Sequence, residues 1–276
     1  MARSCVPILL LLPALIWVGA SPPTPTRPPA ATQAGAPTTR PSRQGAAGTV
    51  PSTQNAIGTA ATQPSDEIAL VIKQAQKLRD ESRFLMAEKM LRGQIDKLAR
   101  GGPERASVST ASCKRVLAMV LADQGQEAEA EAFAIESYAE MKEVFPPDVY
   151  PVGSEERARS AWVLGNILMR SGRTEPAEPV LLEALYWFEA NRSSHWETPM
   201  LASDVGECLL QQGRFAEAED PIVIGYAELR RMRGPDAFET LKALERVFAL
   251  YKSWDKPEKV AEYESLISEV PARKGN

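Results

Sequence analysis

The chain has a single histidine, His195, and only three cysteines among its 276 residues. A zinc site needs three or four converging ligands, and a hydrolytic triad needs a base beside its nucleophile. One histidine with Cys113 and Cys208 meets neither requirement, and no Cys-x-x-Cys pair is present. The phosphate loop, the calcium loop and the protein-kinase motifs are also missing. The sequence therefore predicts no catalytic residue, no metal site and no cofactor. We expect the thiols of Cys113 and Cys208 to be buried and unreactive.

Acidic residues are absent from the start of the chain. All 36 of them lie from Asp66 onward, whereas four arginines are the only charged residues before that point. The remainder carries 32 − 4 = 28 basic residues against those 36, a formal charge of −8. Because nucleic-acid binding requires a concentrated positive face, we do not expect this part of the chain to bind nucleic acid.

Long apolar runs are confined to residues 1–20. Arg3 precedes an apolar run over residues 6–18, and the small residues Gly19 and Ala20 follow the run. This order is typical of a secretory signal peptide that is cleaved after Ala20. The run is shorter than the about 20 apolar residues of a membrane span and contains Pro13. We predict an exported protein, periplasmic or secreted, most simply in a bacterial envelope. An uncleaved N-terminal anchor is the alternative, and no membrane insertion of the mature body is expected.

Large aliphatic and aromatic side chains are scarce in residues 21–64, which consist mainly of Pro, Thr, Ala, Ser, Gly and Gln. Such a segment cannot bury enough apolar surface to offset the entropy lost on ordering. It is predicted to be a disordered linker, either bare or carrying O-linked sugars on its Thr and Ser residues.

In residues 65–276, apolar residues recur at the spacing of an amphipathic α-helix up to the end of the chain. The clearest unit is LLQQGRFAEAEDPIVIGYAEL, residues 209–229. Gly213 supplies the backbone freedom that a helix C-terminus favours, and Phe215 and Ala218 open a second amphipathic helix in which Ala218 permits close approach. One such hairpin cannot bury both of its apolar faces, so it needs copies of itself as neighbours.

Four weaker copies are found by aligning on this unit. The aligned first-helix residues are Ala75, Ala118, Gly165, Gly206 and Phe248, and the aligned second-helix residues are Ala87, Ala130, Ala177, Ala218 and Val260. Ser82 replaces the turn glycine in the first unit, and Asp255 replaces it in the divergent fifth. The intervals are 43, 47, 41 and 42 residues. The longest contains VFPPDVYPVGSEER, whose prolines predict an enlarged loop.

These units resemble tetratricopeptide repeats, although the intervals exceed the usual period of about 34 residues. Longer units are similar to the kinesin-light-chain type and to repeats of bacterial, planctomycete-type proteins. The resemblance implies an all-α fold: a right-handed superhelical solenoid of about five antiparallel helix hairpins, in which the first helices line a concave face.

The resemblance also implies which side chains face the concave groove, and these form the predicted binding site for a partner. They are Gln76, Arg79, Arg115, Arg159, Trp162, Asn166, Arg170, Glu207, Gln211, Lys242, Glu245 and Lys252. Asn166 occupies a place where the family commonly uses Asn to hold ligand backbone. Arg115, Arg159 and Arg170 suggest a basic patch for an acidic segment or a C-terminal carboxylate. The alternative is that they are solvated charges.

Three functions are compatible with this architecture. The favoured one is a non-catalytic, exported scaffold that binds an extended peptide or protein partner in the groove. The alternatives are an extracytoplasmic hydrolase or other enzyme built on helical repeats, and a structural protein that self-associates. His195 is expected in the connection into the fourth unit beside Trp196, and the alternating acids Glu127, Glu129 and Glu131 are expected to be solvated surface.

Overall fold

The computed structural model describes residues 66–101, 107–146 and 154–268, which form ten α-helices and no strand. All of them belong to the second of the chain's two units, residues 54–276. The predicted signal peptide, the linker and residues 147–153 of the proline-rich loop lie outside the described residues. Within these residues, the prediction of an all-α fold is confirmed.

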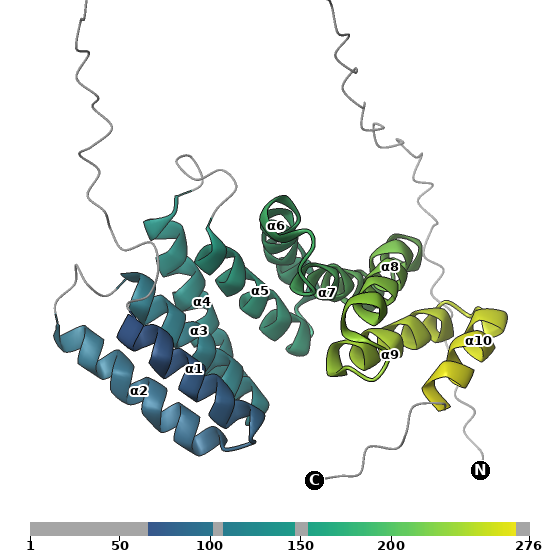
Figure 1. The fold of residues 1–276 in the computed structure, drawn as a ribbon. Coiled ribbons are helices and arrows are strands. Elements are labelled where there is room, and N and C mark those ends of the chain that lie inside the picture. Colours follow the sequence, from purple (N-terminus) through teal and green to yellow (C-terminus); the bar gives the residue numbers. More distant parts are fainter. Residues whose placement is uncertain (1–65, 102–106, 147–153, 269–276) are drawn as a thin grey trace, which may run out of the picture. The chain divides into compact units, whose positions relative to one another are not determined.

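The helices pair into five hairpins (Figure 1). Their bounds are α1 (Asp66–Asp80) with α2 (Phe84–Arg100), α3 (Ser107–Asp123) with α4 (Glu127–Val144), α5 (Glu155–Arg170) with α6 (Thr174–Arg192), α7 (Glu197–Gln211) with α8 (Phe215–Arg233), and α9 (Phe238–Ser253) with α10 (Pro257–Ser268). Each hairpin also packs on the next, and the first helices contact one another in the order α1, α3, α5, α7, α9. This is the predicted stack of five units.

The turn inside each hairpin places one residue in the left-handed backbone region. Gly213 has φ +75°, and its N–H donates to the Leu210 carbonyl at 2.9 Å while the Arg214 N–H donates to the Leu209 carbonyl at 3.0 Å. This pair of bonds closes the C-terminus of α7. Ser82 and Asp255 keep the same conformation, with φ +57° and +54°. The turn geometry therefore survives where the glycine does not.

Small residues allow the two helices of a hairpin to pack at a short distance from each other. A Cβ added to Gly206 on α7 would collide with the Ile222 side chain and would lie 3.1 Å from the Ile222 backbone nitrogen on α8. Ala218, opposite it, is fully buried. Ala87, Ala130 and Ala177, at the aligned positions of the first three hairpins, are also fully buried.

An apolar core runs through all five hairpins. Phe188 on α6 is fully buried and meets the rings of Trp162 and Trp187 edge-on, with centroids 5.6 and 5.2 Å away. Cys113 and Cys208 are buried thiols, as predicted, and burial raises the pKa of each to about 11. At neutral pH both are therefore protonated and unreactive.

Candidate binding groove

A pocket of about 220 Å³ lies on the face formed by the first helices. Every residue that lines it comes from α1, α3, α5, α7 or α9. They are Arg79, Met119, Ala122, Asp123, Val163, Asn166, Ile167, Met169, Arg170, Glu207, Gln211 and Lys242. Four of these helices contribute the residues of their last turn, so stacking of the hairpins brings their C-terminal ends together around one space.

The structure divides the predicted groove residues into two sets. The set that lines the pocket is Arg79, Asn166, Arg170, Glu207, Gln211 and Lys242. The set that lies outside it is Gln76, Arg115, Arg159, Trp162, Glu245 and Lys252. Gln76 is half-buried on α1, Glu245 is exposed on α9, and the exposed Lys252 has its ammonium 5.8 Å from the ring centre of Phe248.

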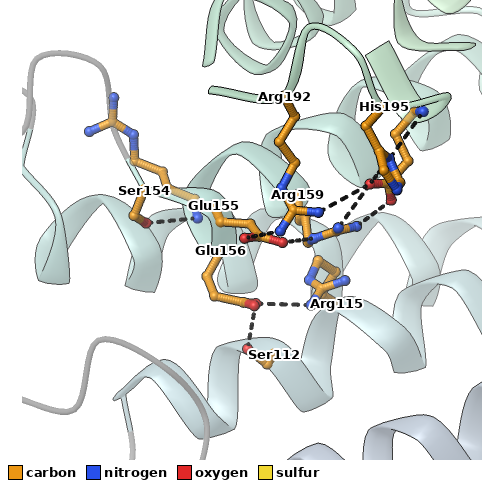
Figure 2. A network of polar contacts seen from close by, with 10 residues as sticks. Ser112, Arg115, Ser154, Glu155, Glu156, Arg159, Arg192 and His195 are labelled. Atoms are coloured by element: carbon orange, nitrogen blue, oxygen red, sulfur yellow. Dashed lines mark hydrogen bonds and ion pairs between the residues drawn. The ribbon is translucent and has the colours of Figure 1, made fainter. Parts of the chain in front are cut away.

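Arg115 is closed in by its neighbours and does not reach open solvent. Its side chain is 7 % exposed, and its guanidinium lies 3.0 Å from Glu156 Oε2, which also accepts a hydrogen bond from Ser112 at 3.0 Å (Figure 2). A charge buried between stacked helices is stable only when a counter-charge meets it. Arg115 therefore joins α3 to α5 and is not available to a partner.

Arg159 is engaged in the same way. Its two terminal nitrogens donate to both oxygens of Glu197, at 2.7 and 3.0 Å, and its Nε donates to Glu155 at 3.0 Å. Glu155 also accepts from Arg192 at 2.7 Å (Figure 2). For Arg115 and Arg159, the sequence-based expectation of an open basic patch, or of free solvated charges, is wrong. Arg115 is held by Glu156 of the next unit, and Arg159 is held by Glu155 of its own helix and Glu197 of the next unit.

His195 lies between α6 and α7, as predicted. Its Nδ1 is 3.1 Å from Glu197 Oε2 (Figure 2). Its ring centre is 5.7 Å from that of Trp196. Among the residues that the structure describes, no three His, Cys, Asp or Glu side chains gather as metal ligands. None of the described helices is long and apolar enough to span a membrane.

A second buried network joins α5, α7 and α9 through Asp204. Its carboxylate accepts hydrogen bonds from Trp162 Nε1 at 2.5 Å and from Asn166 Nδ2 at 3.2 Å, and it pairs with Arg246. Arg246 also pairs with Glu207 at 2.5 Å. Burial disfavours the charge on Arg246, but the attraction of the two carboxylates outweighs it and raises the pKa of Arg246.

Sequence reasoning missed Asp204 and Arg246, although a signal was present. The two residues stand 42 positions apart, which equals the interval between units four and five. Arg115 and Glu156 are separated by 41 positions, six fewer than the 47-residue interval between units two and three, so this pair does not follow the repeat period. For Asp204 and Arg246, opposite charges one repeat apart on first helices were a sign of pairing between neighbouring units.

The acidic residues at the start of α4 are partly exposed, as expected of surface acids, and each also pairs with an arginine from another helix or turn. Glu127, Glu129 and Glu131 meet Arg170 at 2.9 Å, Arg92 at 2.8 Å and Arg173, respectively. Successive acids point to different faces, as expected, and each face there presents an arginine.

Most of the charged groups that line the pocket are already engaged. Asp123 is held by Arg79, whose Nε lies 2.5 Å from Oδ2, and by Arg170 at 3.6 Å. Arg170 also donates to the Ala122 carbonyl at 2.6 Å. Lys242 and Gln211 have no hydrogen-bond or ion-pair partner in the described part of the chain. Both side chains therefore keep all of their polar atoms open to a ligand.

Comparison with known proteins supports the repeat architecture. Residues 110–148, which include most of α3 and all of α4, match the family model of the tetratricopeptide repeat. This match confirms the resemblance noted from the sequence for the second unit. A comparison of the sequence with characterised proteins found no match.

Several solved structures share the fold at low sequence identity. The nearly identical TPR-like repeats of a Podosopora anserina protein described as a kinesin light chain superpose with a TM-score of 0.58 and 14 % identity, over 73 % of this chain and 93 % of that one. BtubC (BKLC) from P. vanneervenii has a TM-score of 0.58 and 15 % identity, over 76 % and 85 %. A Rap protein complexed with competence and sporulation factor has a TM-score of 0.55 and 17 % identity, over 73 % and 52 %.

Proposed function

We propose that this chain, whose second hairpin matches a tetratricopeptide repeat, is a non-catalytic scaffold that binds an extended segment of a partner protein along its first helices. The observation that carries the proposal is the pocket to which all five first helices contribute. A ligand in this pocket contacts several units at once, so stacking builds the site. A Rap protein that shares this fold over 52 % of its length was solved in complex with competence and sporulation factor, which supports a ligand-binding role for the fold.

The pocket offers what recognition of a peptide backbone requires. Asn166 donates its amide hydrogen to Asp204, which orients the side chain and leaves its carbonyl oxygen to accept from a peptide N–H. Gln211, exposed at the end of α7, can both donate and accept. Met119 and Val163 add half-buried apolar surface on α3 and α5. An extended segment satisfies both kinds of surface, because its polar backbone and its side chains point in different directions.

Site-directed photo-crosslinking tests this proposal. Benzoyl-phenylalanine in place of Met119 should yield discrete adducts in the native envelope fraction, and mass spectrometry should map them to one segment of a partner. The same residue in place of Tyr186, which is 62 % exposed on α6, is the matched control and should yield no such adduct. Adducts of equal yield from both positions, or none from Met119, would contradict the proposal.

The same experiment addresses the enzymatic alternative. A scaffold leaves its partner chemically unchanged, so the crosslinked segment should have its genetically encoded mass and intact ends. Recovery of a cleaved or modified segment, dependent on the pocket residues, would favour an enzyme built on helical repeats.

Export is the second part of the proposal and is supported by the signal-peptide pattern of residues 1–20 and the linker composition of residues 21–64. The intact mass of the protein recovered from the envelope should correspond to an N-terminus at Ser21. A retained Met1 would instead indicate an N-terminal anchor.

A further inference from the structure

The side chains that line the pocket carry one more positive charge than negative charge, and one of the cations has no carboxylate partner in the described part of the chain. Three cations, Arg79, Arg170 and Lys242, and two carboxylates, Asp123 and Glu207, line the pocket. Asp123 is shared by the two arginines, and Arg170 also pairs with Glu127 outside the pocket lining. Glu207 is paired with Arg246 from behind the pocket wall. Lys242 alone among these five has no carboxylate within the described residues.

Lys242 is also positioned where a ligand would cover it. It is half-buried near the start of α9 and shares the pocket with the half-buried apolar side chains of Met119 and Val163. A neutral ligand over this ammonium would remove water from it without returning a counter-charge, which is unfavourable. A carboxylate supplies that counter-charge, and the apolar surface beside it favours an apolar neighbour.

We propose that the pocket selects extended segments in which an acidic side chain lies next to an apolar one. Lys242 pairs with the carboxylate, and Met119 and Val163 cover the apolar side chain. The inference rests on the proposed peptide-binding function and specifies the ligand class of the same site. Lys242 is then the residue that determines specificity.

The carboxylate belongs to an Asp or Glu side chain and not to a chain end. Capture of a C-terminal carboxylate uses the fork of an arginine or a nest of free backbone N–H groups. Both arginines of the pocket are already paired, Arg79 with Asp123 and Arg170 with Glu127 and Asp123. The lysine ammonium is a point charge on a flexible stem, which suits a single side-chain carboxylate on a segment that passes through the groove.

Retention of degenerate peptide pools by the immobilised full chain tests this assignment. Three pools of nonapeptides, acetylated at the N-terminus and amidated at the C-terminus, share a central Leu-Xaa-Zaa. Xaa is any residue, and the flanking positions hold a mixture of small residues. The pools differ only at Zaa, which is Glu in the first, Gln in the second and Lys in the third. A fourth pool has Gln at Zaa and a free C-terminus. Bound peptides are quantified by mass spectrometry. The Glu pool should be retained about threefold better than the Gln pool, the size expected of one partly exposed ion pair.

Two lysine variants of α9 make the test specific. Lys242→Met keeps the stem and removes the charge, and it should retain the Glu and Gln pools equally. Lys252→Met, on the same helix but outside the pocket, should keep the threefold preference. Because neither lysine has an ion-pair partner in the described residues, helical circular dichroism should be unchanged in both variants.

The outcomes separate the two proposals. Equal retention of the Glu and Gln pools by the unmodified chain, or a preference that persists in Lys242→Met, overturns the acidic-segment inference while leaving peptide binding intact. Preferential retention of the free C-terminal pool overturns the assignment to a side-chain carboxylate. Failure of every pool to bind overturns both the inference and the proposed function.

Discussion

Ser82 shows how a single residue carries the geometry of a hairpin turn. It holds φ at +57°, where the other turns of the first four hairpins have glycine. The left-handed region costs a residue with a Cβ about 1–2 kcal/mol, and glycine loses about 0.5–1 kcal/mol more chain entropy on folding than such a residue. Because the first cost is the larger, serine at position 82 makes the turn between α1 and α2 slightly less stable than glycine would.

Replacing Ser82 with glycine should therefore raise the free energy of unfolding by about 0.5–1 kcal/mol. Urea denaturation followed by circular dichroism measures the change as a higher midpoint at unchanged slope. The reciprocal variant, Gly213→Ser in the turn of the fourth hairpin, should lower the midpoint. A lower midpoint for Ser82→Gly would mean that the Ser82 side chain stabilises its turn.

Gly206 is restricted by a different cause, which is lack of space. An added Cβ would collide with Ile222 and lie 3.2 Å from the Ala218 carbonyl oxygen. Gly206→Ala should destabilise the protein by about 1–3 kcal/mol through overpacking, measured in the same urea experiment. Gly93→Ala on α2 is the control, since nothing lies within 4 Å of its added Cβ. It should stabilise the helix by up to about 1 kcal/mol, so the two glycine-to-alanine changes should have opposite signs.

At the scale of elements, the first helices are joined by buried polar contacts as well as by apolar packing. Asp204 on α7 receives Trp162 and Asn166 from α5 and Arg246 from α9. The side chains of Asp204 and Arg246 are 1 % and 5 % exposed. This network fixes the register of three consecutive units and forms the wall behind Glu207 in the pocket.

Asp204→Ala should destabilise the protein by about 3–5 kcal/mol, because it leaves the buried Arg246 with Glu207 as its remaining carboxylate partner among the described residues. Urea denaturation of the full chain provides the measurement. Asp220→Ala, which removes an exposed acid from α8, should change stability by less than about 0.5 kcal/mol. Similar effects for the two variants would show that the network contributes no more than a surface charge.

At the scale of the whole molecule, stability is distributed along the stack. Each hairpin contacts its neighbours, so a local defect should weaken nearby units and leave distant ones unaffected. The last hairpin is a suitable place to see this, because Tyr263 of α10 stacks on Tyr251 of α9, with ring centres 5.6 Å apart, and meets Tyr226 of α8 edge-on at 6.3 Å.

Tyr263→Ala should lower hydrogen-exchange protection in α9 and α10 by an amount equivalent to about 3 kcal/mol, while protection in α3 and α4 stays the same. Native-state exchange with mass-spectrometric detection resolves these segments. Tyr186→Ala, a change at an exposed tyrosine of α6, should alter neither region. A uniform loss of protection along the chain would show that the stack unfolds as one cooperative unit.

The sequence alone determined the hairpins, because their causes are local. The helical period, the turn at Gly213 and the small residue Ala218 act within one unit, so one clear copy made the weaker ones recognisable. Even Ser82 and Asp255 were located as turn residues by spacing. The same alignment indicated which side chains face inward, and half of the predicted groove residues do line the pocket.

Only the tertiary structure decided which inward side chains remain available. Arg115 and Lys242 look equivalent in the sequence, since each is a cation on the inner side of a first helix. Stacking places Glu156 against Arg115 and gives Lys242 no carboxylate within the described residues. The difference depends on residues about one repeat away, whose distance is set by how the hairpins pack. The choice between a structural ion pair and an open binding group is therefore a property of the stack and not of any one unit.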